Sequence, residues 1–347
     1  MDAFYASIEQ RENLRYRGRP VIVGADPKHG QGRGVVAACS YEARRFGIRS
    51  ALPISQAYRL CPHGIYVRPN MTRYSQVSRQ IHEIFHTVTP KVEPLSIDEA
   101  FLDVSEKVDG VEGALELAGR LKRRIMSEQR LTASVGIAAS KFVAKIASDL
   151  EKPDGLVIVE PENVQAFLDP LPISRIWGVG PKTEERLKEI GVNTIEQLRT
   201  LDAGLLKTRF GKMGDHLWNL ANGIDSRSVV TERKATSLSQ ERTFSEDTND
   251  QEQLAQVIQK LSSRIAERLA KHGQGGRTVT LKLRYSDFTT LTRQISFRHL
   301  VCSAQEIREV AVRLLYRHWD KHRKIRLLGI AISPLESLAL DKQMRLF

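Results

Sequence analysis

The sequence predicts an α+β protein of several domains, and three observations support that fold class. The chain has 347 residues, which is more than one simple core usually accommodates. Over residues 1–159 short apolar strands alternate with amphipathic helices, whereas from about residue 160 helices follow one another through short connections. After a polar stretch at 231–243, strands and helices alternate again. We therefore expect an α+β module, a helical module and a second α+β module.

The first module begins with an abrupt change from strand to helix. Residues 1–9 are typical of the end of a strand that turns directly into a helix. Short strands are expected at 20–24 and 34–38, separated by a turn rich in glycine and lysine, and a short helix is expected at 41–47, closed by Gly47.

The rest of this module has the order of a ferredoxin-like core. Amphipathic helices are predicted at 71–89 and 112–129, and a strand at 131–137. Ser140 is expected to cap the helix that follows, because its hydroxyl can accept a hydrogen bond from a free N–H of the first turn. Two helices that pack on one face of a sheet fit a ferredoxin-like α+β arrangement.

Two adjacent carboxylates, Asp98 and Glu99, lie within a run of strand-forming residues at 92–104. Consecutive side chains of a strand point to opposite faces, so one acid can be held while the other reaches across a cleft. Carboxylates beside apolar residues repel each other unless a cation lies between them. A divalent metal is the usual solution, and ligands that are all oxygen favour magnesium. The alternative is an acidic, solvated sheet edge.

Two glycines precede a helix in the helical module. Gly178 and Gly180 are followed by Pro181 at the first helical turn, and this helix ends before Gly191. Such a hairpin exposes backbone N–H groups at a helix N-terminus, which suits a phosphate group. Lys182 and Arg186 flank it, so we interpret it as a helix-hairpin-helix contact with the DNA backbone, independent of base sequence. The alternative is an ordinary glycine-capped turn.

The C-terminal module is predicted to be a second α+β unit. The expected elements are helices at 253–272 and 304–319 and strands at 277–285, 290–297 and near 325–332. Basic residues alternate along the first of these strands, and we expect them to lie on one face that follows a phosphate backbone. A plain solvated face is the alternative.

The net charge favours a polyanionic partner. The chain has 53 Lys and Arg against 41 Asp and Glu, a net charge of +12, of which +8 falls in residues 231–347. Nucleic acid is the first expectation and an acidic membrane the second. Three widely spaced cysteines, Cys39, Cys61 and Cys302, are typical of reduced thiols in the cytoplasm. The sequence contains no run of eighteen apolar residues and no signal-peptide pattern, so we expect a cytoplasmic protein without a membrane partner.

Five motifs in this order resemble the Y-family translesion DNA polymerases of the DinB type. They are Met1-Asp2-Ala3-Phe4-Tyr5, Tyr41-Glu42-Ala43-Arg44-Arg45-Phe46-Gly47, Ser96-Ile97-Asp98-Glu99-Ala100, Ala144-Lys145-Ile146-Ala147-Ser148-Asp149 with Lys152-Pro153-Asp154-Gly155, and Gly178-Val179-Gly180. Each motif is weak alone, but the ordered set is specific and spans essentially the whole chain.

The resemblance implies a polymerase shaped like a right hand. It assigns the palm to 1–10 and 70–159, the fingers to 11–69, a helix-hairpin-helix thumb to 160–230, a linker to 231–240, a little finger to 241–340 and a clamp-binding tail to 341–347. The implied activity is template-directed addition of deoxynucleotides in translesion synthesis and DNA damage tolerance. Low fidelity is also implied, because the fingers are rich in small residues, namely Gly32, Gly34, Ala37, Ala38 and Ser40.

The resemblance assigns two Mg²⁺ ions to the acidic pair. Nucleotidyl transfer uses two metal ions about 3.5–4 Å apart, one at the primer 3′-oxygen and one at the triphosphate. By resemblance, Asp98 bridges both ions and Glu99 binds the catalytic one. The main-chain carbonyl of Met1 is expected to face the ion bound to the triphosphate.

Further roles follow from the same resemblance. Tyr41, Arg44 and Lys152 match positions that bind the β- and γ-phosphates, where cations neutralise the charge of the transition state. Tyr5 matches the steric gate, a ring under the incoming sugar that leaves no room for a 2′-hydroxyl. Without the resemblance, Arg44 would be assigned to a surface helix and Tyr5 to the core.

The implied partners are primer–template DNA, deoxynucleoside triphosphates and the bacterial sliding clamp. The DNA contacts are assigned to Gly178, Gly180 and Lys182 in the thumb and to Arg277, Lys282 and Arg284 in the little finger. The last five residues resemble a clamp-docking peptide, in which Gln343 meets a polar rim while Leu346 and Phe347 fill an apolar pocket. A monomer associated with the bacterial nucleoid is expected.

One departure from the family pattern concerns the first strand. Members have a strand that ends Asp-hydrophobic-Asp, and the first of those acids binds metal. The sequence begins at the middle residue, Met1, and retains only Asp2. Either Met1 is an internal methionine of a longer protein, which we favour, or the chain is a true truncation with impaired chemistry.

Two other functional classes stay open at this point. A chain with only two of three metal ligands could be a clamp-tethered protein that binds primer–template DNA without catalysis. A helix-hairpin-helix nuclease or glycosylase would instead need a catalytic Lys or Asp beside the hairpin, for which Pro181-Lys182 gives weak support.

Overall fold

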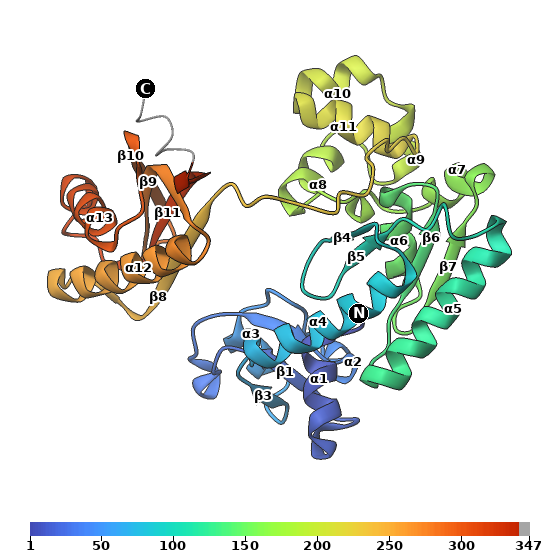
Figure 1. Cartoon of the computed structure of the whole chain (residues 1–347), viewed down its shortest axis with the longest axis horizontal. Coiled ribbons are helices and arrows are strands. Elements are labelled where there is room, and N and C mark those ends of the chain that lie inside the picture. The colour runs from blue at the N-terminus through green and yellow to red at the C-terminus, as the bar shows by residue number, and fades with distance from the viewer. Residues whose placement is uncertain (340–347) are drawn as a thin grey trace. The chain divides into compact units, whose positions relative to one another are not determined.

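The structure is a computed structural model that describes residues 1–339. The chain divides into two compact units, Met1–Glu232 and a second that begins at Arg233 (Figure 1). Each unit has its own hydrophobic core. No helix within residues 1–339 is long and apolar enough to cross a membrane.

The first unit opens with a small three-stranded sheet. Its elements are α1 (Phe4–Glu12), β1 (Val21–Gly24), β2 (Val36–Cys39), α2 (Tyr41–Arg44), α3 (Ile54–Leu60) and β3 (Ile65–Val67). β1 is the central strand, antiparallel to β2 and parallel to β3. Ser40 caps α2 by accepting a hydrogen bond from the Ala43 N–H, and this short helix therefore starts at Tyr41.

The palm-like part of the unit combines helices with two pairs of strands. Its elements are α4 (Met71–Val88), β4 (Val92–Pro94), β5 (Ala100–Leu102), α5 (Gly110–Gln129), β6 (Val135–Ala138), α6 (Lys141–Leu150) and β7 (Leu156–Val159). Ile81 and Ile84 of α4 share a core with Ile125 of α5, as expected for amphipathic helices. The predicted cap of α6 is confirmed, because the Ser140 hydroxyl accepts a hydrogen bond from the Val143 N–H.

Asp98 and Glu99 do not lie on a strand, which corrects the expectation that both acids are strand residues. β4 pairs with β5 in an antiparallel hairpin, and Asp98 and Glu99 lie in the connection between them. Backbone N–H groups of Leu95 and Ser96 donate to the Glu99 carbonyl oxygen. The Ser96 hydroxyl adds a 2.8 Å hydrogen bond to Asp98. These local bonds favour a turn over a strand, and they place both acids at the tip of a hairpin.

The expected sheet of the ferredoxin-like core is present as two separate pairs. β4 pairs only with β5, and β6 pairs only with β7, in parallel. Among residues 1–339 no strand lies between β5 and β6. A pocket of about 210 Å³ lies there instead, lined by both strands and by apolar side chains of α5 such as Leu117 and Leu121.

The helical part of this unit packs on α6. Its helices are α7 (Val164–Leu168), α8 (Pro181–Lys188), α9 (Ile195–Thr200), α10 (Ala203–Phe210) and α11 (Lys212–Ala221). Leu217 and Leu220 of α11 belong to the same buried cluster as Phe142 of α6. α6 is therefore common to both parts of the unit.

A buried ion pair fixes the base of the acidic hairpin. Glu93 of β4 accepts a 2.7 Å hydrogen bond from the ammonium of Lys141, the first residue of α6, and their side chains are 1% and 9% exposed. Glu93 also accepts from the Val230 N–H at 2.9 Å, and Lys141 donates to the Ser228 carbonyl at 2.7 Å. The end of the helical part is thus attached to the hairpin that presents Asp98 and Glu99.

Lys141→Met is expected to lower the free energy of unfolding of the first unit by about 3 kcal/mol, because Glu93 would lose the ammonium it contacts at 2.7 Å while its charge stays buried. Urea unfolding read by peptide-resolved hydrogen exchange measures this unit separately from the second. Lys91→Met is the matched control, because Lys91 pairs with Glu106 at the surface and its loss should cost under about 1 kcal/mol. Equal losses in the two variants would contradict the interpretation.

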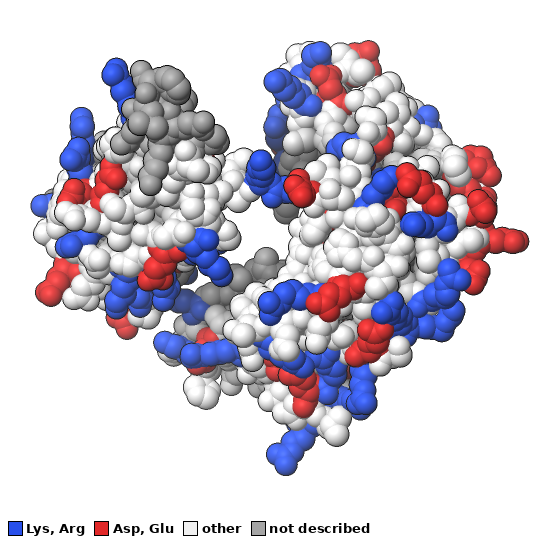
Figure 2. Space-filling model, viewed as in Figure 1, with Lys and Arg blue, Asp and Glu red and all other residues white. Residues whose placement is uncertain are grey.

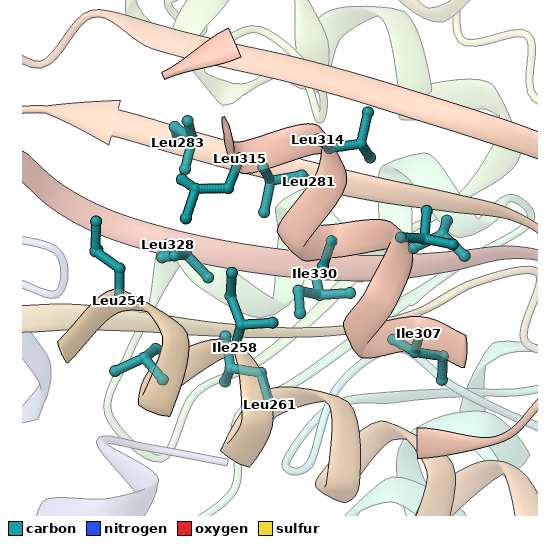
Figure 3. Packing of buried hydrophobic residues seen from close by; sticks show 14 of the residues in the cluster. Leu254, Ile258, Leu261, Leu281, Leu283, Ile307, Leu314, Leu315, Leu328 and Ile330 are labelled. Atoms are coloured by element: carbon teal, nitrogen blue, oxygen red, sulfur yellow. The ribbon is translucent and has the colours of Figure 1, made fainter. Parts of the chain in front are cut away.

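The second unit is a four-stranded antiparallel sheet covered on one face by two helices (Figure 1). Its elements are β8 (Leu238–Thr248), α12 (Gln251–Lys271), β9 (Gln274–Tyr285), β10 (Thr290–Val301), α13 (Ala304–His318) and β11 (Ile325–Ser337), with strand order β10-β9-β11-β8. Figure 3 shows Leu254, Ile258 and Leu261 of α12 packing towards the sheet. Leu281 and Leu283 of β9 meet them from the strand side, and the opposite face of the sheet stays polar.

Candidate active site and nucleic-acid interface

The pocket between β5 and β6 brings most of the predicted metal and phosphate residues together. Its lining includes Met1, Asp98, Glu99, Lys145 and Lys152. These residues come from the chain start, the acidic turn and the α6 region, so segments about 100 and 50 residues apart in sequence converge here. Of the five, only Lys145 was not predicted from the sequence.

Asp98 is held at the tip of the hairpin by short-range bonds. Its Oδ1 accepts from the Ser96 hydroxyl at 2.8 Å, and its main-chain N–H donates to the same Ser96 oxygen at 3.2 Å. The Met1 amino group donates to the Asp98 carbonyl at 2.9 Å and lies 4.0 Å from Oδ2. Burial lowers the pKa of that amino group. Met1 therefore lies next to Asp98, the acid that is predicted to share a metal ion with the Met1 carbonyl.

Glu99 is the first member of a chain of ion pairs. Its Oε1 accepts from the Lys145 ammonium at 3.0 Å, and the same ammonium donates to Asp149 at 2.9 Å. The second oxygen of Asp149 lies 2.6 Å from the ammonium of Lys152. Burial alone would lower the pKa of Lys145, but the charges of Glu99 and Asp149 outweigh it and raise this pKa. Lys145 thus stays cationic between two acids.

Asp2 has a structural role away from the acidic pair. Its side chain is buried and accepts from the Ser134 hydroxyl at 2.8 Å and from the Asp154 N–H at 2.9 Å. These bonds attach the chain start to the segments before β6 and β7. Asp2 is thus held by hydrogen bonds that have no part in the acidic pair.

Tyr41 and Arg44 lie together on α2. The Arg44 guanidinium is 4.4 Å from the centre of the Tyr41 ring. The Tyr41 hydroxyl is buried and has no hydrogen-bond partner in the part of the chain that the structure describes. Burial raises the pKa of this hydroxyl. A buried donor without a partner beside a cation suits an anionic ligand such as a phosphate.

Tyr5 is braced from behind by a second aromatic ring. The rings of Tyr5 and Tyr74 stack with centroids 4.3 Å apart and an interplanar angle of 13°. Tyr74 is fully buried on α4, and its hydroxyl donates to Glu9 at 2.5 Å. Burial and the nearby Asp98 charge raise the pKa of Tyr5. A ring fixed in this way near the acidic turn has the rigidity that a steric gate requires.

The small residues of the fingers segment differ in exposure. Ala37 is exposed and lines a shallow depression with Gly24, Ala25 and Val35. Gly32 is buried, and a Cβ there would lie 2.0 Å from the Asp26 carbonyl oxygen, so its small size is needed by the loop itself. Composition alone therefore overstates how many of these residues face an open site.

The donor set for a metal consists of two carboxylates. Within residues 1–339 no group of three or more His, Cys, Asp or Glu side chains is arranged around a common metal position. Mg²⁺ usually keeps several waters and binds one or two carboxylates together with substrate phosphates. Asp98 and Glu99 therefore fit a magnesium site that the substrate completes.

The predicted glycine hairpin forms at the start of α8. Gly178 has φ 101°, a conformation that favours glycine, and Gly180 is the N-cap residue ahead of Pro181. Lys182 is exposed at this helix start. Arg186 instead donates to the Arg209 carbonyl at 2.7 Å and lies over the Phe210 ring. Both flanking cations are exposed, and Arg186 is held by these contacts within the helical part.

The basic residues of β9 do not share one face, which corrects the expectation from sequence. Lys282 and Arg284 alternate with the buried Leu281, Leu283 and Tyr285, and they lie on the polar face. Lys282 pairs with Glu241 at 2.8 Å. Arg277 belongs to the opposite face of the strand, and its guanidinium donates hydrogen bonds to both carboxylate oxygens of Glu336 at 2.9 and 3.0 Å. Lys282 and Arg284 are two positions apart and therefore lie on the same face of the strand. Arg277 is five positions from Lys282 and seven from Arg284, which places it on the other face.

The surface seen in Figure 2 has no single basic patch. In the view of Figure 2, Lys and Arg side chains are distributed over both units and interspersed with acids. The predicted clamp-binding residues Gln343, Leu346 and Phe347 lie outside the described residues.

Lys145 and Asp149 were named from the sequence only as members of a motif, and their role at the site was missed. Their spacing of four on α6 is the spacing of a helical ion pair, and it could have signalled that they act together. Nothing local indicated that Glu99, 46 residues earlier, would join them. Tyr74 was also missed, because an aromatic residue on the buried face of an amphipathic helix is normally part of the core.

Comparison with protein families gives three matches in chain order. Residues 1–149 match the impB/mucB/samB family, residues 161–192 match the IMS family HHH motif, and residues 235–346 match the impB/mucB/samB family C-terminal domain. The middle match covers the hairpin with Gly178 and Gly180.

Similar proteins are found along nearly the whole chain. A DNA polymerase IV of Clostridioides difficile is 45% identical over 336 residues, covering 96% of this chain and 91% of that protein. A DNA polymerase IV of Alkalilimnicola ehrlichii is 45% identical over 349 residues, covering 100% of this chain and 97% of that protein.

Solved structures show the same architecture. A Y-family DNA polymerase chimera has a TM-score of 0.86 at 30% identity, with 97% of each chain covered. DinB from Sulfolobus solfataricus has a TM-score of 0.64 at 30% identity, with 96% of each chain covered. These likenesses confirm the fold class of palm, fingers, helix-hairpin-helix thumb and little finger. The chain belongs to the Y family of DNA polymerases, in its DNA polymerase IV (DinB) branch.

Proposed function

We infer that this chain is a template-directed DNA polymerase that adds deoxynucleotides during translesion synthesis and DNA damage tolerance. The observation that supports this activity best is the convergence of the acidic turn with two lysines of the α6 region in one pocket. Family membership gives the reaction class, and the acids and lysines that line the pocket support the proposal that these residues perform it. Synthesis of low fidelity and low processivity belongs to the same proposal.

The acidic turn is proposed to hold two Mg²⁺ ions. Asp98 would bridge both, Glu99 would bind the one at the primer 3′-oxygen, and the Met1 carbonyl would face the other. When bound, such ions activate the attacking oxygen and neutralise the leaving phosphate. The chain's own contribution is orientation, because Ser96 holds Asp98 and, before a metal ion binds, Lys145 holds Glu99.

The triphosphate is proposed to bind between α2 and the end of α6. Tyr41 offers a buried hydroxyl that has no hydrogen-bond partner among residues 1–339, and Arg44 offers a guanidinium over the same ring. Lys152, whose ammonium lies 2.6 Å from Asp149, would supply the third contact. Three donors of this kind can hold the β- and γ-phosphates while negative charge builds on the leaving group.

Tyr5 is proposed to discriminate between sugars. Its ring is held by the stack on Tyr74, so it cannot easily move away from a 2′-hydroxyl. Exclusion by shape needs such rigidity, because a mobile ring would yield at little energetic cost.

DNA is proposed to contact each unit separately. Gly178, Gly180 and Lys182 would meet one backbone phosphate group at the start of α8, where free N–H groups and the helix dipole favour an anion. Lys282 and Arg284 would follow a backbone along the polar face of β9. For Arg277 the proposal requires that a phosphate replace Glu336, its present partner.

Lys182→Ala is expected to weaken DNA binding similarly for all base sequences and to reduce the slope of log affinity against log salt by about 1, because one phosphate contact is lost. Fluorescence anisotropy on two primer–template sequences at several salt concentrations measures both quantities. Lys207→Ala is the control, because Lys207 pairs with Asp215 on the same helical part. A sequence-dependent loss in Lys182→Ala would contradict a backbone contact.

The C-terminal residues Gln343, Leu346 and Phe347 are proposed to dock a single copy of the chain on the sliding clamp. The support is chemical, since a glutamine and two apolar residues suit a pocket with a polar rim.

Primer extension past a damaged template tests the proposed function. The chain, a primed template with one abasic site, Mg²⁺ and four deoxynucleotides should yield products that extend beyond the lesion. DNA binding without any extension, on damaged and undamaged templates alike, would instead support the clamp-tethered binding protein. Cleavage of the template would support the nuclease or glycosylase class.

A further inference from the structure

A chain of alternating charges links the acidic turn to the phosphate-binding lysine. It comprises Glu99, Lys145, Asp149 and Lys152, with successive oxygen–nitrogen distances of 3.0, 2.9 and 2.6 Å. All four side chains are between 21% and 35% exposed, so the ion pairs are partly shielded from water. Lys145 is the central cation, because it touches both acids.

We propose that Lys145 is a positioning residue, an exchangeable counter-cation that neutralises and orients Glu99. When a divalent cation binds Glu99 in its place, Lys145 leaves Glu99 and stays paired with Asp149. This inference rests on the proposed function, because it assigns Glu99 to a metal ion.

The geometry supports an exchange rather than a permanent pair. Lys145 already contacts Asp149 at 2.9 Å, so it can leave Glu99 without losing every partner. Glu99 lies in a turn that can present its second oxygen to the pocket, whereas Lys145 and Asp149 are one helical turn apart on α6. The helix therefore keeps the lysine–aspartate pair together whatever occupies Glu99.

The Lys145 ammonium and a divalent cation compete for the Glu99 carboxylate. A divalent cation and the Lys145 ammonium carry charge of the same sign, and both are attracted to the Glu99 carboxylate. Asp149 moderates this competition because it shares the ammonium. The same Asp149 holds Lys152, so any shift of Lys145 towards Asp149 weakens the hold on Lys152 and favours its release to a phosphate.

Two substitutions should therefore change metal affinity in opposite directions. Lys145→Met removes the competing ammonium, and we expect it to lower the dissociation constant for Mn²⁺ about fivefold. Asp149→Asn removes the alternative partner, so Lys145 stays on Glu99 and the constant should rise by about the same factor. A merely structural role of the ion pairs would weaken binding in both variants, because both would loosen the site.

The experiment is a Mn²⁺ titration of the full chain followed by electron paramagnetic resonance, without DNA or nucleotide. Glu99→Gln defines the part of the binding that belongs to this site. Lys145→Arg should resemble the unaltered chain, because the cation is retained. Lys91→Met is the matched control, since it also removes a lysine that pairs with two acids, Asp103 and Glu106, away from the turn. Circular dichroism melting identifies any variant that fails to fold.

Opposite shifts in Lys145→Met and Asp149→Asn, with no shift in Lys91→Met, would establish the inference. The inference would be overturned if both variants shifted the dissociation constant for Mn²⁺ in the same direction. It would also be overturned if Lys145→Met changed that constant no more than Lys91→Met does, or if Glu99→Gln left Mn²⁺ binding unchanged. The proposed function fails separately, if the unaltered chain does not extend primers at any Mg²⁺ concentration. The Mn²⁺ titration does not require extension, so the two failures are distinguishable.

Discussion

Asp98→Ala is expected to lower the rate of nucleotide insertion by this chain about a thousandfold or more. Asp98 is the acid assigned to both metal ions, so its loss removes charge stabilisation at the attacking and the leaving oxygen together. The fold should tolerate the change, because Asp98 lies in a turn and its side-chain bond to Ser96 is local. Rapid-quench insertion of one nucleotide on a preformed primer–template complex measures the rate.

Asp103→Ala is the matched control for this prediction. Asp103 follows the same hairpin, and its carboxylate lies 3.9 Å from the Lys91 ammonium and outside the pocket lining. Its removal should leave insertion within about threefold of the unaltered rate, since surface pairs contribute under about 1 kcal/mol. Primer–template affinity should be unchanged in both variants. An Asp98→Ala chain that retains a tenth of the rate would rule out Asp98 as the bridging ligand.

Tyr5→Ala is expected to reduce the preference for deoxynucleotides over ribonucleotides by about a hundredfold. The ring is stacked on Tyr74 behind it, so its removal opens space where the ring now lies. A steric contact of one small group is worth about 1–3 kcal/mol, which corresponds to roughly 10- to 200-fold in selectivity. The ratio of kcat/KM for a deoxynucleotide and its ribonucleotide measures the effect.

Tyr5→Phe separates the ring from its hydroxyl. It should retain the discrimination, because the flat ring and not the phenol oxygen blocks the 2′-position. A Tyr5→Ala chain with unchanged sugar preference would refute the gate. Equal loss of preference in Tyr5→Phe would instead indicate a hydrogen-bonding role for the hydroxyl.

Much of the fold could be predicted because its signals are local. Ser140 ahead of an apolar helical pattern predicted the cap of α6, and the hydroxyl indeed accepts from the Val143 N–H. Amphipathic spacing likewise predicted α4 and α5. Asp98 and Glu99 were wrongly expected on a strand, because strand propensity continues through the whole run. Its division into β4 and β5 depends on hydrogen bonds from Leu95 and Ser96 to Glu99, which a propensity pattern does not reveal.

The candidate site was predictable where a motif is contiguous and was missed where partners are distant in sequence. Asp98 and Glu99 stand out as adjacent acids, whereas Lys145 is an ordinary helical lysine until Glu99 is placed beside it. Arg277 shows the converse error. It was expected on the same strand face as Lys282 and Arg284. The alternation of side chains along the strand places it on the opposite face, where it pairs with Glu336. Long-range ion pairs decide such cases, and single-sequence patterns do not contain them.

The central claim is that the turn with Asp98 and Glu99 performs insertion directed by the template base. The most direct measurement is single-turnover insertion of each deoxynucleotide opposite each of the four template bases, with the unaltered chain and with Glu99→Gln. We expect the unaltered chain to insert the complementary nucleotide fastest on every template, and Glu99→Gln to lose insertion on all four while it still binds DNA. Insertion that ignores the template base, or that persists at the full rate in Glu99→Gln, would contradict the claim.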